Sequence, residues 1–404
     1  MGLLLVVHEI DEPALYGAAA AVIAAQHGGR VLYPEFRFDT DLHADAVQHV
    51  LANGGLGPSG IYWSDRLTQQ SAGAASSIDE IVAASRDEKI VVPIHIEFLR
   101  NPTLPGALVQ AARNAGVETT IVSIDTVGNS FVEGDQRIAE RDSFGRIVTG
   151  AHGAENRQPL EIGFIAAESD QRNVYPAILA SLADAADSLN IDLNIRFIDP
   201  VALREAGNFE IPASLAGVLL PGGADMKNVP GQIEAAAATL SSNVPTVGLC
   251  LGMQTMATAI AWRRFGRGTA NLGEADPQAP IKTFVPMAGE NGLDGQSLPE
   301  HRTGVNSSAV TAETRLAEIL PTSTQVHYNH RYRLDPRLLD TLEEAGLRVA
   351  ATGFDGAIVD AIEHRDHPFF IGMQGHPELG SREENPHPLL VAFLSAALEY
   401  SHSH

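Results

Sequence analysis

Short apolar runs alternate with longer amphipathic or alanine-rich stretches along the first half of the chain. The longer stretches predict helices near 13–26, 41–52, 77–86 and 105–115. The apolar runs predict buried strands, which read "LLLVVHE" (3–9), "RVLYPE" (30–35), "GIYWSD" (60–65), "KIVVPIHIEF" (89–98) and "TTIVSID" (119–125). Strands that alternate with helices are typical of a mostly parallel sheet flanked by helices.

The second half repeats this alternation after a break. Residues 126–158 are polar and contain glycines with only weak periodicity, so we place a domain boundary there, near 155. Helices are predicted at 173–189, 231–241, 252–265 and 386–400, and irregular structure at 266–300. Strands are predicted at 160–168, 193–199, 216–223, 246–250, 347–353, 357–364 and 369–376. The pattern therefore predicts two α/β domains, 1–155 and 156–404, each with a mostly parallel sheet flanked by helices.

Charge and composition narrow the classes of partner. The 404 residues carry a formal net charge of −23, which argues against a nucleic-acid or anionic-membrane partner because phosphate-rich surfaces attract Lys and Arg. A single cysteine cannot form an internal disulfide, which fits a reducing compartment. The first residues show no basic region before a short apolar run, and no run is long enough to span a bilayer. We expect a soluble cytoplasmic protein.

The single cysteine, Cys250, lies in "TVGLCLGMQ", between a predicted strand and a predicted helix. A nucleophile at such a corner is exposed on a sharp turn, with the amides of the new helix behind it. His376, just after the apolar run "FFIGMQ", can act as its base. Glu378 lies two residues further, on the same side of an extended segment, and can fix the tautomer of that imidazole.

An acyl-transfer site also needs donors for a developing oxyanion. The turn Pro221-Gly222-Gly223 follows a predicted strand, and no side chain of its glycines blocks their amides. The amide of Leu251, at the start of the cysteine helix, is a second donor. His327 and His330 have a spacing that suits a metal, but no third ligand is evident, so no metal site is predicted.

Several segments occur in the order found in a known family. "PGG", "GLCLGMQ" and "GHPE" resemble the triad-type, class I glutamine amidotransferases, and more specifically the glutaminase domain of CTP synthase. The same resemblance covers about 158–400, through "EIGFIAAESDQRNVYPAI" at its start, "HRY" (330–332), "GLRVA" (346–350), "HPFF" (367–370) and "HPLLVAFLSAA" (387–397). Residues 1–155 resemble no family that we recognise, and they contain no G-x-x-x-x-G-K-[ST] phosphate loop.

The resemblance implies a role for each matching residue. Cys250 would be the nucleophile, His376 the base and Glu378 its orienter, with Gly223 and Leu251 as the oxyanion hole. The glutamine contacts would come from Gly222, Gln254, Glu274, Arg331 and Tyr332. This chemistry converts L-glutamine into glutamate and ammonia through a cysteine thioester, and it needs no cofactor or metal ion.

The sequence leaves the use of the ammonia open. An acceptor on the N-terminal domain, a separate synthetase subunit, a γ-glutamyl hydrolase without transfer and a non-catalytic regulatory protein all remain alternatives, and so does a homo-oligomer. Polar residues do gather at the carboxyl ends of the predicted N-terminal strands, where parallel sheets bind ligands. They are His8, Glu9, Glu35, Ser64, Asp65, His95, Glu97 and Asp125.

Overall fold

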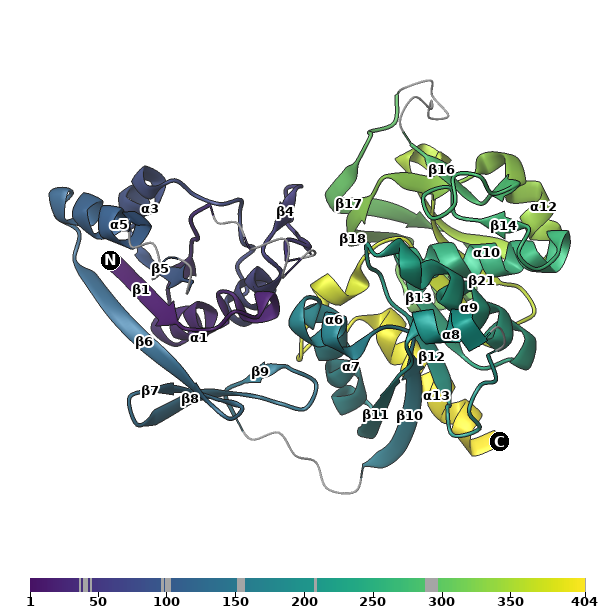
Figure 1. The fold of residues 1–404 in the computed structure, drawn as a ribbon, viewed down its shortest axis with the longest axis horizontal. Coiled ribbons are helices and arrows are strands. Elements are labelled where there is room, and N and C mark those ends of the chain that lie inside the picture. Colours follow the sequence, from purple (N-terminus) through teal and green to yellow (C-terminus); the bar gives the residue numbers. More distant parts are fainter. Residues whose placement is uncertain are drawn as a thin grey trace. The chain divides into compact units, whose positions relative to one another are not determined.

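The computed structural model describes all residues except 36–37, 39–42, 44–45, 96–97, 99–102, 151–156, 207–208, 288–296 and 404. The chain forms two compact units, each built on a sheet with helices (Figure 1). The first comprises Met1–Gly153 with Ser169–Ala180, and the second comprises Ala154–Glu168 with Ser181–His404. None of the helices in these described ranges is both long enough and apolar enough to cross a membrane.

The sheet of the first unit is parallel in one half and antiparallel in the other. Its strands are β1 (Gly2–His8), β2 (Arg30–Val31), β5 (Lys89–Ile94), β6 (Thr119–Val127), β7 (Ser130–Glu133), β8 (Gln136–Arg141) and β9 (Ile147–Val148). Their order is β2-β5-β1-β6-β7-β8-β9, parallel from β2 to β6 and antiparallel from β6 to β9. A small hairpin, β3 (His49–Val50) with β4 (Leu56–Gly57), stands apart from this sheet.

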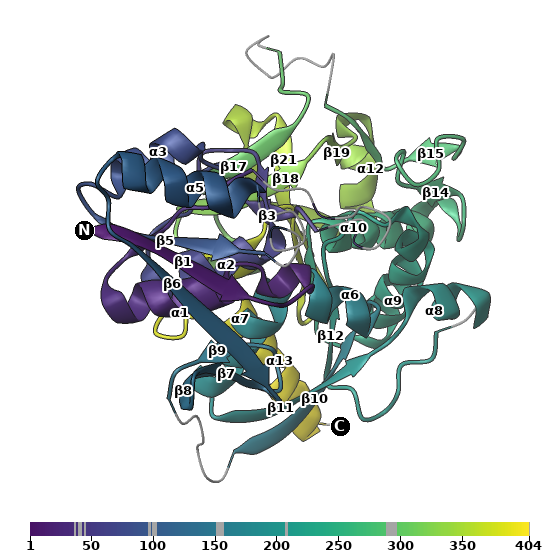
Figure 2. The same cartoon turned by 60° about the vertical axis from the view of Figure 1, so that its left-hand side comes forward.

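Helices cover both faces of this sheet. They are η1 (Pro13–Leu15), α1 (Ala18–His27), η2 (Ser59–Ile61), α2 (Tyr62–Thr68), α3 (Ile78–Ala84), α5 (Thr103–Asn114) and α6 (Glu168–Asn173). Leu3 and Leu5 pack with α3 and α5 in one apolar cluster. Because strand side chains alternate, Val6 and His8 face the other side, towards α1. Figure 2 shows α3 and α5 together on one side of β1 and α1 on the other.

Two predictions for the first unit are wrong. Residues 60–65 form η2 and α2 instead of a strand, because tertiary contacts override the β-propensity of their aromatic side chains. Gly60 packs against the backbone of Tyr16, and the Trp63 indole donates to Ala14 O at 2.7 Å. Within 41–52, predicted helical, His49 and Val50 form β3, while 41, 42, 44 and 45 lie outside the described residues.

The weakly periodic segment 126–158 contains regular secondary structure. It contains the antiparallel strands β7, β8 and β9. The two-residue turns Gly128-Asn129 and Gly134-Asp135 connect β6 to β7 and β7 to β8, with each glycine at a positive φ (60° and 57°). Gly followed by Asn or Asp between short strands is a hairpin signal, so the sequence did contain the evidence.

The sheet of the second unit also joins a parallel half to an antiparallel half. Its strands are β10 (Gln158–Phe164), β11 (Ile191–Phe197), β12 (Gly217–Leu220), β13 (Thr246–Leu249), β17 (Arg302–Val310), β18 (Ser323–His330), β20 (Leu347–Gly353), β21 (Ile358–His364) and β22 (Phe370–Met373). The order is β11-β10-β12-β13-β22-β21-β20-β17-β18, parallel from β11 to β22 and antiparallel beyond. The short strands β14 (Ala270–Asn271), β15 (Ile281–Lys282), β16 (Phe284–Pro286) and β19 (Tyr332–Leu334) pair outside it.

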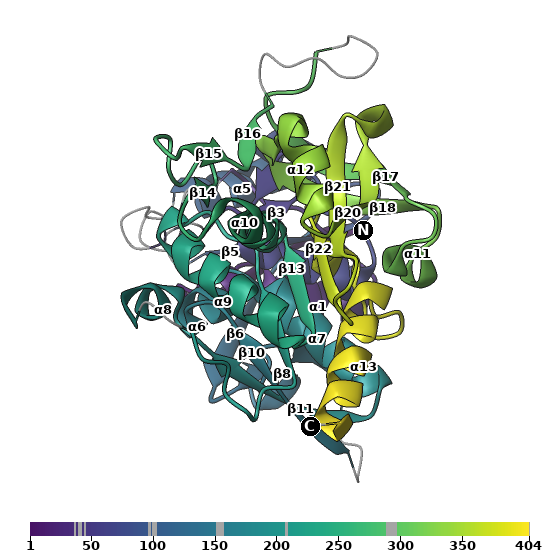
Figure 3. The ribbon, with the colours of Figure 1, turned by 90° about the vertical axis from the view of Figure 1, so that its right-hand side faces the viewer.

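The helices of the second unit lie on both faces of this sheet. They are α7 (Pro176–Ser188), α8 (Pro200–Ala206), η3 (Met226–Asn228), α9 (Val229–Ser242), α10 (Leu251–Phe265), α11 (Arg315–Ile319), η4 (Pro336–Leu338), α12 (Leu339–Glu344), η5 (Phe354–Gly356), η6 (Pro377–Gly380) and α13 (Pro388–Ser403). Val218 and Leu220 of β12 face α9 and α10 in the main apolar cluster. Gly217 faces Phe393 and Ala397 of α13 on the opposite side, and Figure 3 shows α13 and α9 well separated.

The strands β17 and β18 were not predicted from the sequence. Their buried positions include Arg302, Ser308 and His330, so the usual alternation of apolar and polar residues is absent. Arg302 forms a buried ion pair with Asp360 of β21 (Nη1–Oδ1 2.5 Å), and Ser308 donates to the same carboxylate at 2.5 Å. A polar network therefore replaces the apolar face that sequence patterns detect.

Glycines allow α10 to lie directly on the sheet. Gly248 of β13 is in register with Leu220 of β12 and Gly372 of β22. A Cβ at Gly252, in the first turn of α10, would lie 2.0 Å from Leu220 O, and a Cβ at Gly248 would lie 2.3 Å from Met256 Sδ. Backbone atoms cannot move aside as a side chain can, so the position of α10 depends on Gly252.

We predict that Gly252→Ala destabilises the protein by about 3 kcal/mol, because a methyl group there overlaps a strand carbonyl. Urea unfolding followed by circular dichroism measures this. Gly106→Ala, a helical glycine of α5 with no atom near the added methyl group, is the matched control and should be neutral or stabilising. Equal unfolding midpoints for Gly252→Ala and the unchanged protein would contradict the packing argument.

Candidate active site

Cys250 occupies a strained turn between β13 and α10. Its φ of 50° and ψ of −107° lie outside the regions that non-glycine residues usually adopt. Its amide donates to Met373 O at 2.8 Å, which ties the turn to β22. The side chain is 8 % exposed. Strain of this kind persists only where surrounding contacts enforce it, and it is typical of nucleophiles presented at a strand-to-helix turn.

His376 lies directly beside Cys250. Its amide donates to His327 O at 2.7 Å, which anchors it to β18, and the Cys250 side chain acts on its imidazole through its charge. A Cβ at Gly222 would lie 3.1 Å from His376 Cε1 and 3.3 Å from Cys250 Cβ. Gly222 therefore leaves the space in which the thiol and the imidazole meet.

Glu378 fixes the orientation of the imidazole. His376 Nδ1 donates to Glu378 Oε1 at 2.8 Å, so Nε2 is the nitrogen left for Cys250. Burial alone lowers the pKa of His376, but the negative charges of Cys250 and Glu378, with the hydrogen bond to Glu378, raise it well above 6.5. The arrangement therefore favours the imidazolium form of His376.

Of the two predicted oxyanion donors, Leu251 follows Cys250 in the chain, and Gly223 follows Gly222, which borders Cys250. Gly223 follows β12 with a φ of 153°, and nothing lies within 4 Å of where its Cβ would be, so this turn is open. Leu251 is the first residue of α10. The first amides of a helix have no acceptor within the helix, so the Leu251 N–H makes no hydrogen bond within α10.

Glu274, Arg331 and Tyr332 come together through short backbone contacts. Gly273 N donates to Phe284 O at 3.1 Å, and β16 pairs with β19, the strand that begins at Tyr332. Partial burial raises the pKa of Glu274, and the positive charge of Arg331 lowers it in turn. Burial raises the pKa of Tyr332, and so does the charge of Glu274. A carboxylate, a guanidinium and a phenol therefore share one surface.

The sequence analysis missed two residues that contact the sulfur, Gln374 and Asn329. Gln374 Nε2 lies 3.6 Å from Cys250 Sγ, and Asn329 O lies 3.8 Å from it. His330, which follows Asn329 on β18, has its pKa lowered to about 4, mainly by burial and by the charge of Arg302, so its imidazole is neutral. Gln374 lies two residues before His376, just after β22, and nothing in the local sequence pattern predicts that its side chain faces the sulfur.

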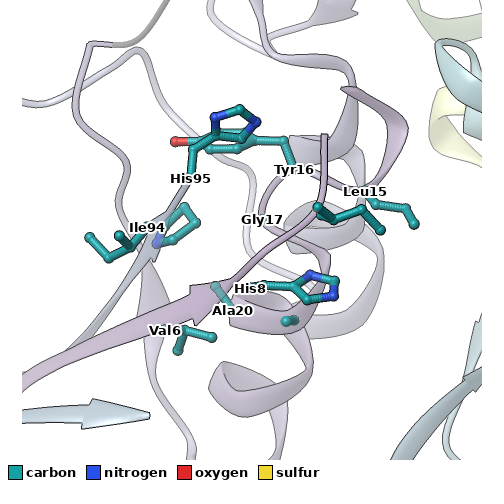
Figure 4. A pocket seen from close by; sticks show the side chains of 11 residues that line it. Val6, His8, Leu15, Tyr16, Gly17, Ala20, Ile94 and His95 are labelled. Atoms are coloured by element: carbon teal, nitrogen blue, oxygen red, sulfur yellow. The ribbon is translucent and has the colours of Figure 1, made fainter. Parts of the chain in front are cut away.

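Two of the polar residues predicted at the ends of the N-terminal strands, His8 and His95, line the same pocket. His8 at the end of β1, His95 just after β5, and Tyr16 line one pocket with about 10 Å³ of free space, room for roughly one water molecule (Figure 4). His8 Nε2 is hydrogen bonded to Thr126 Oγ1 at 2.8 Å. Burial lowers the pKa of His8 to about 4, although the charge of Asp125 raises it. This imidazole is therefore neutral at physiological pH.

The other predicted strand-end residues do not line this pocket. Asp65 instead accepts from buried His49 at 3.0 Å, and Ser64 is buried beside it in α2. Glu9 and Glu35 are exposed at the surface. Glu97 lies outside the described residues. The predicted cluster is thus reduced to His8 and His95, with Asp125 acting on His8 through its charge.

Comparison with known proteins assigns the second unit. The sequence model of the family described as "Glutamine amidotransferase class-I" matches residues 172–396, more than half of the chain. The CTP synthase of Chlamydia muridarum is 32% identical over 248 residues, which are 61% of this chain and 45% of that enzyme. The CTP synthase of Mycobacterium tuberculosis is 37% identical over 195 residues, 46% of this chain and 32% of that enzyme. The chain spans less than half the length of these relatives.

A solved structure supports the same fold. The glutaminase domain of Trypanosoma brucei CTPS, with bound acivicin, superposes with a TM-score of 0.53 at 24% identity, over 59% of this chain and 94% of that one. The matched ranges contain the turn at Cys250 and the segment from His376 to Glu378. The chain belongs to the class-I glutamine amidotransferase family, with a glutaminase unit like that of CTP synthase.

Proposed function

We propose that the protein hydrolyses L-glutamine at Cys250 and passes the ammonia to an acceptor. One observation carries this proposal. Cys250 lies at a strained turn, His376 lies beside it, and Glu378 is hydrogen bonded to His376. A structural cysteine needs neither a charged imidazole beside it nor a carboxylate to orient that imidazole. Family membership supports the same chemistry.

The reaction follows from the positions of these groups. The Cys250 thiolate attacks the side-chain carboxamide carbon of glutamine, and the amides of Gly223 and Leu251 stabilise the oxyanion that forms. The C–N bond then breaks as the His376 imidazolium gives its proton to the leaving nitrogen, which departs as ammonia. Neutral His376 next takes a proton from water, which hydrolyses the γ-glutamyl thioester to glutamate and regenerates the thiolate and imidazolium.

The remaining residues position the α-carbon end of the substrate. Glu274 supplies a carboxylate for the α-ammonium group, and Arg331 with Tyr332 supplies donors for the α-carboxylate. Gln254, one helical turn after Cys250, and the Gly222 backbone contact the chain between these ends. Opposite charges at fixed positions select a free amino acid over an uncharged amide.

The acceptor belongs to the N-terminal unit or to a partner protein, such as a separate synthetase subunit. Free ammonia in water at neutral pH is mostly ammonium, which is not nucleophilic, so delivery inside protein favours a covalently attached acceptor domain. In the N-terminal unit, the pocket of His8, His95 and Tyr16 has room for roughly one water molecule, so it is too small to hold an acceptor. The sequence of that unit contains no phosphate loop, so we propose that it does not bind ATP.

Replacing the nucleophile should abolish the reaction. Cys250→Ser and Cys250→Ala are expected to lower glutamate release from glutamine by several orders of magnitude, on the order of 10⁶ in kcat, without loss of fold. The assay measures glutamate with and without candidate acceptors and ATP. Wild-type rates in either variant would rule out the proposed function, and glutamate release that requires ATP would rule out an ATP-independent N-terminal unit.

The charge of Glu378 should be visible in the pH profile. The free enzyme needs its imidazolium, so kcat/KM for glutamine should fall on the alkaline side only well above pH 6.5. Glu378→Gln removes a charge that raises the pKa of His376, and it should therefore move this limb to lower pH by about one unit or more. Glu384→Gln, at an exposed carboxylate, is the control. An unmoved limb would show that Glu378 does not set the protonation of His376.

Glu274→Ala tests the proposed ammonium contact. That contact exists in both the bound substrate and the transition state, so its loss should raise KM for glutamine much more than it lowers kcat. Steady-state kinetics of glutamate release separate the two constants. A KM equal to that of the unchanged protein would make Glu274 an ordinary surface acid.

A further inference from the structure

Gln374 is buried against the sulfur of Cys250. It follows β22 directly, is 1 % exposed, and places Nε2 3.6 Å from Cys250 Sγ. Its amide end is therefore a hydrogen-bond donor to that sulfur. Asn329 O, 3.8 Å from Sγ on another side, can only accept, so it favours the neutral thiol. The Gln374 donor opposes this carbonyl and favours the thiolate.

A second glutamine fixes which way the Gln374 amide points. Gln254 Nε2 donates to Gln374 Oε1 at 3.2 Å. Since Gln374 then accepts at Oε1, its NH₂ group faces the sulfur. Gln254 uses its own NH₂ group in this contact, and its Oε1 is buried without a protein hydrogen-bond partner, although the side chain is only 5 % exposed. An acceptor is thus left for an incoming donor.

The backbone holds Gln374 in this place independently of its side chain. Its N–H donates to Asp360 O at 2.7 Å. Asp360 is held by Arg302 through two hydrogen bonds (2.5 and 3.1 Å) and by Tyr328 at 3.1 Å. The preceding residue, Met373, accepts the amide of Cys250. The polar network of β17, β18 and β21 therefore sets the distance between Gln374 and the thiol.

We propose that Gln374 is a further catalytic residue, whose amide N–H stabilises the Cys250 thiolate and whose carbonyl turns Gln254 to accept from an N–H group of the substrate. The proposal rests on the proposed glutaminase function, and it links the charge of the sulfur to substrate recognition. Glutamine brings N–H donors in its carboxamide and its ammonium group. The unpartnered Gln254 Oε1 provides the acceptor that such a donor needs.

Alkylation of Cys250 by iodoacetamide across pH tests the contact without any glutaminase assay. Only the thiolate reacts, and Cys250 is the single cysteine, so mass spectrometry reads one site. Gln374→Leu should move the midpoint of this profile to higher pH by about one to two units, the usual effect of losing one hydrogen bond to a charged group. Gln374→Glu, which keeps the size and polarity but lacks the NH₂ donor, should move it in the same direction.

Two matched variants separate the roles. Gln325→Leu, at an exposed glutamine of β18, should leave both the alkylation midpoint and glutamine kinetics unchanged. Gln254→Leu removes the donor that orients the Gln374 amide, so it should move the midpoint in the same direction but by less than Gln374→Leu, and it should also raise KM for glutamine several-fold. Folded Gln374 variants with an unmoved midpoint would overturn the proposal. A moved midpoint in a protein that releases no glutamate would support the contact and reject the glutaminase function, so the two failures are distinguishable.

Discussion

The contact between the first turn of α10 and the sheet is the constraint on which the site depends. Helix and strand backbones meet at Gly252 with no room for a Cβ, and this close approach leaves the chain only a sharp reversal at Cys250. The reversal forces Cys250 to a φ of 50°, a backbone conformation that is unfavourable for a non-glycine residue. Strand pairing and the Cys250–Met373 hydrogen bond stabilise the turn, so the sulfur sits at a fixed point above the carboxyl ends of β12, β13 and β22.

From that point, electrostatics accounts for the rest of the site. A buried imidazole would ordinarily be neutral, as His330 is, but His376 has a carboxylate on one nitrogen and the cysteine on the other. The charges beside the two imidazoles set their pKa values apart. The antiparallel half of the sheet supplies much of this environment, because β18 anchors His376 and the Asp360 network anchors Gln374.

The sequence predicted the structure correctly where a regular hydrophobic pattern places reactive residues at the end of a strand. The strand–helix corner at Cys250, the His376–Glu378 pair and the parallel strands of both main sheets were predicted from local order alone. Predictions failed where tertiary contacts override local preference, as at Trp63, and where buried polar groups interrupt alternation, as at Arg302. Gln374 was missed because its role depends on contacts with Cys250 and Gln254, which are more than a hundred residues away in the chain. No local pattern encodes such a meeting.

The central claim is that glutamine is attacked by Cys250, and a trapped intermediate tests it most directly. The protein is mixed with glutamine, quenched in acid within the first turnovers, digested and analysed by mass spectrometry. The account predicts a γ-glutamyl thioester on the peptide that contains Cys250, absent from the Cys250→Ser protein. Glutamate release by the unchanged protein without any adduct on Cys250, at quench times that capture the first turnovers, would contradict it.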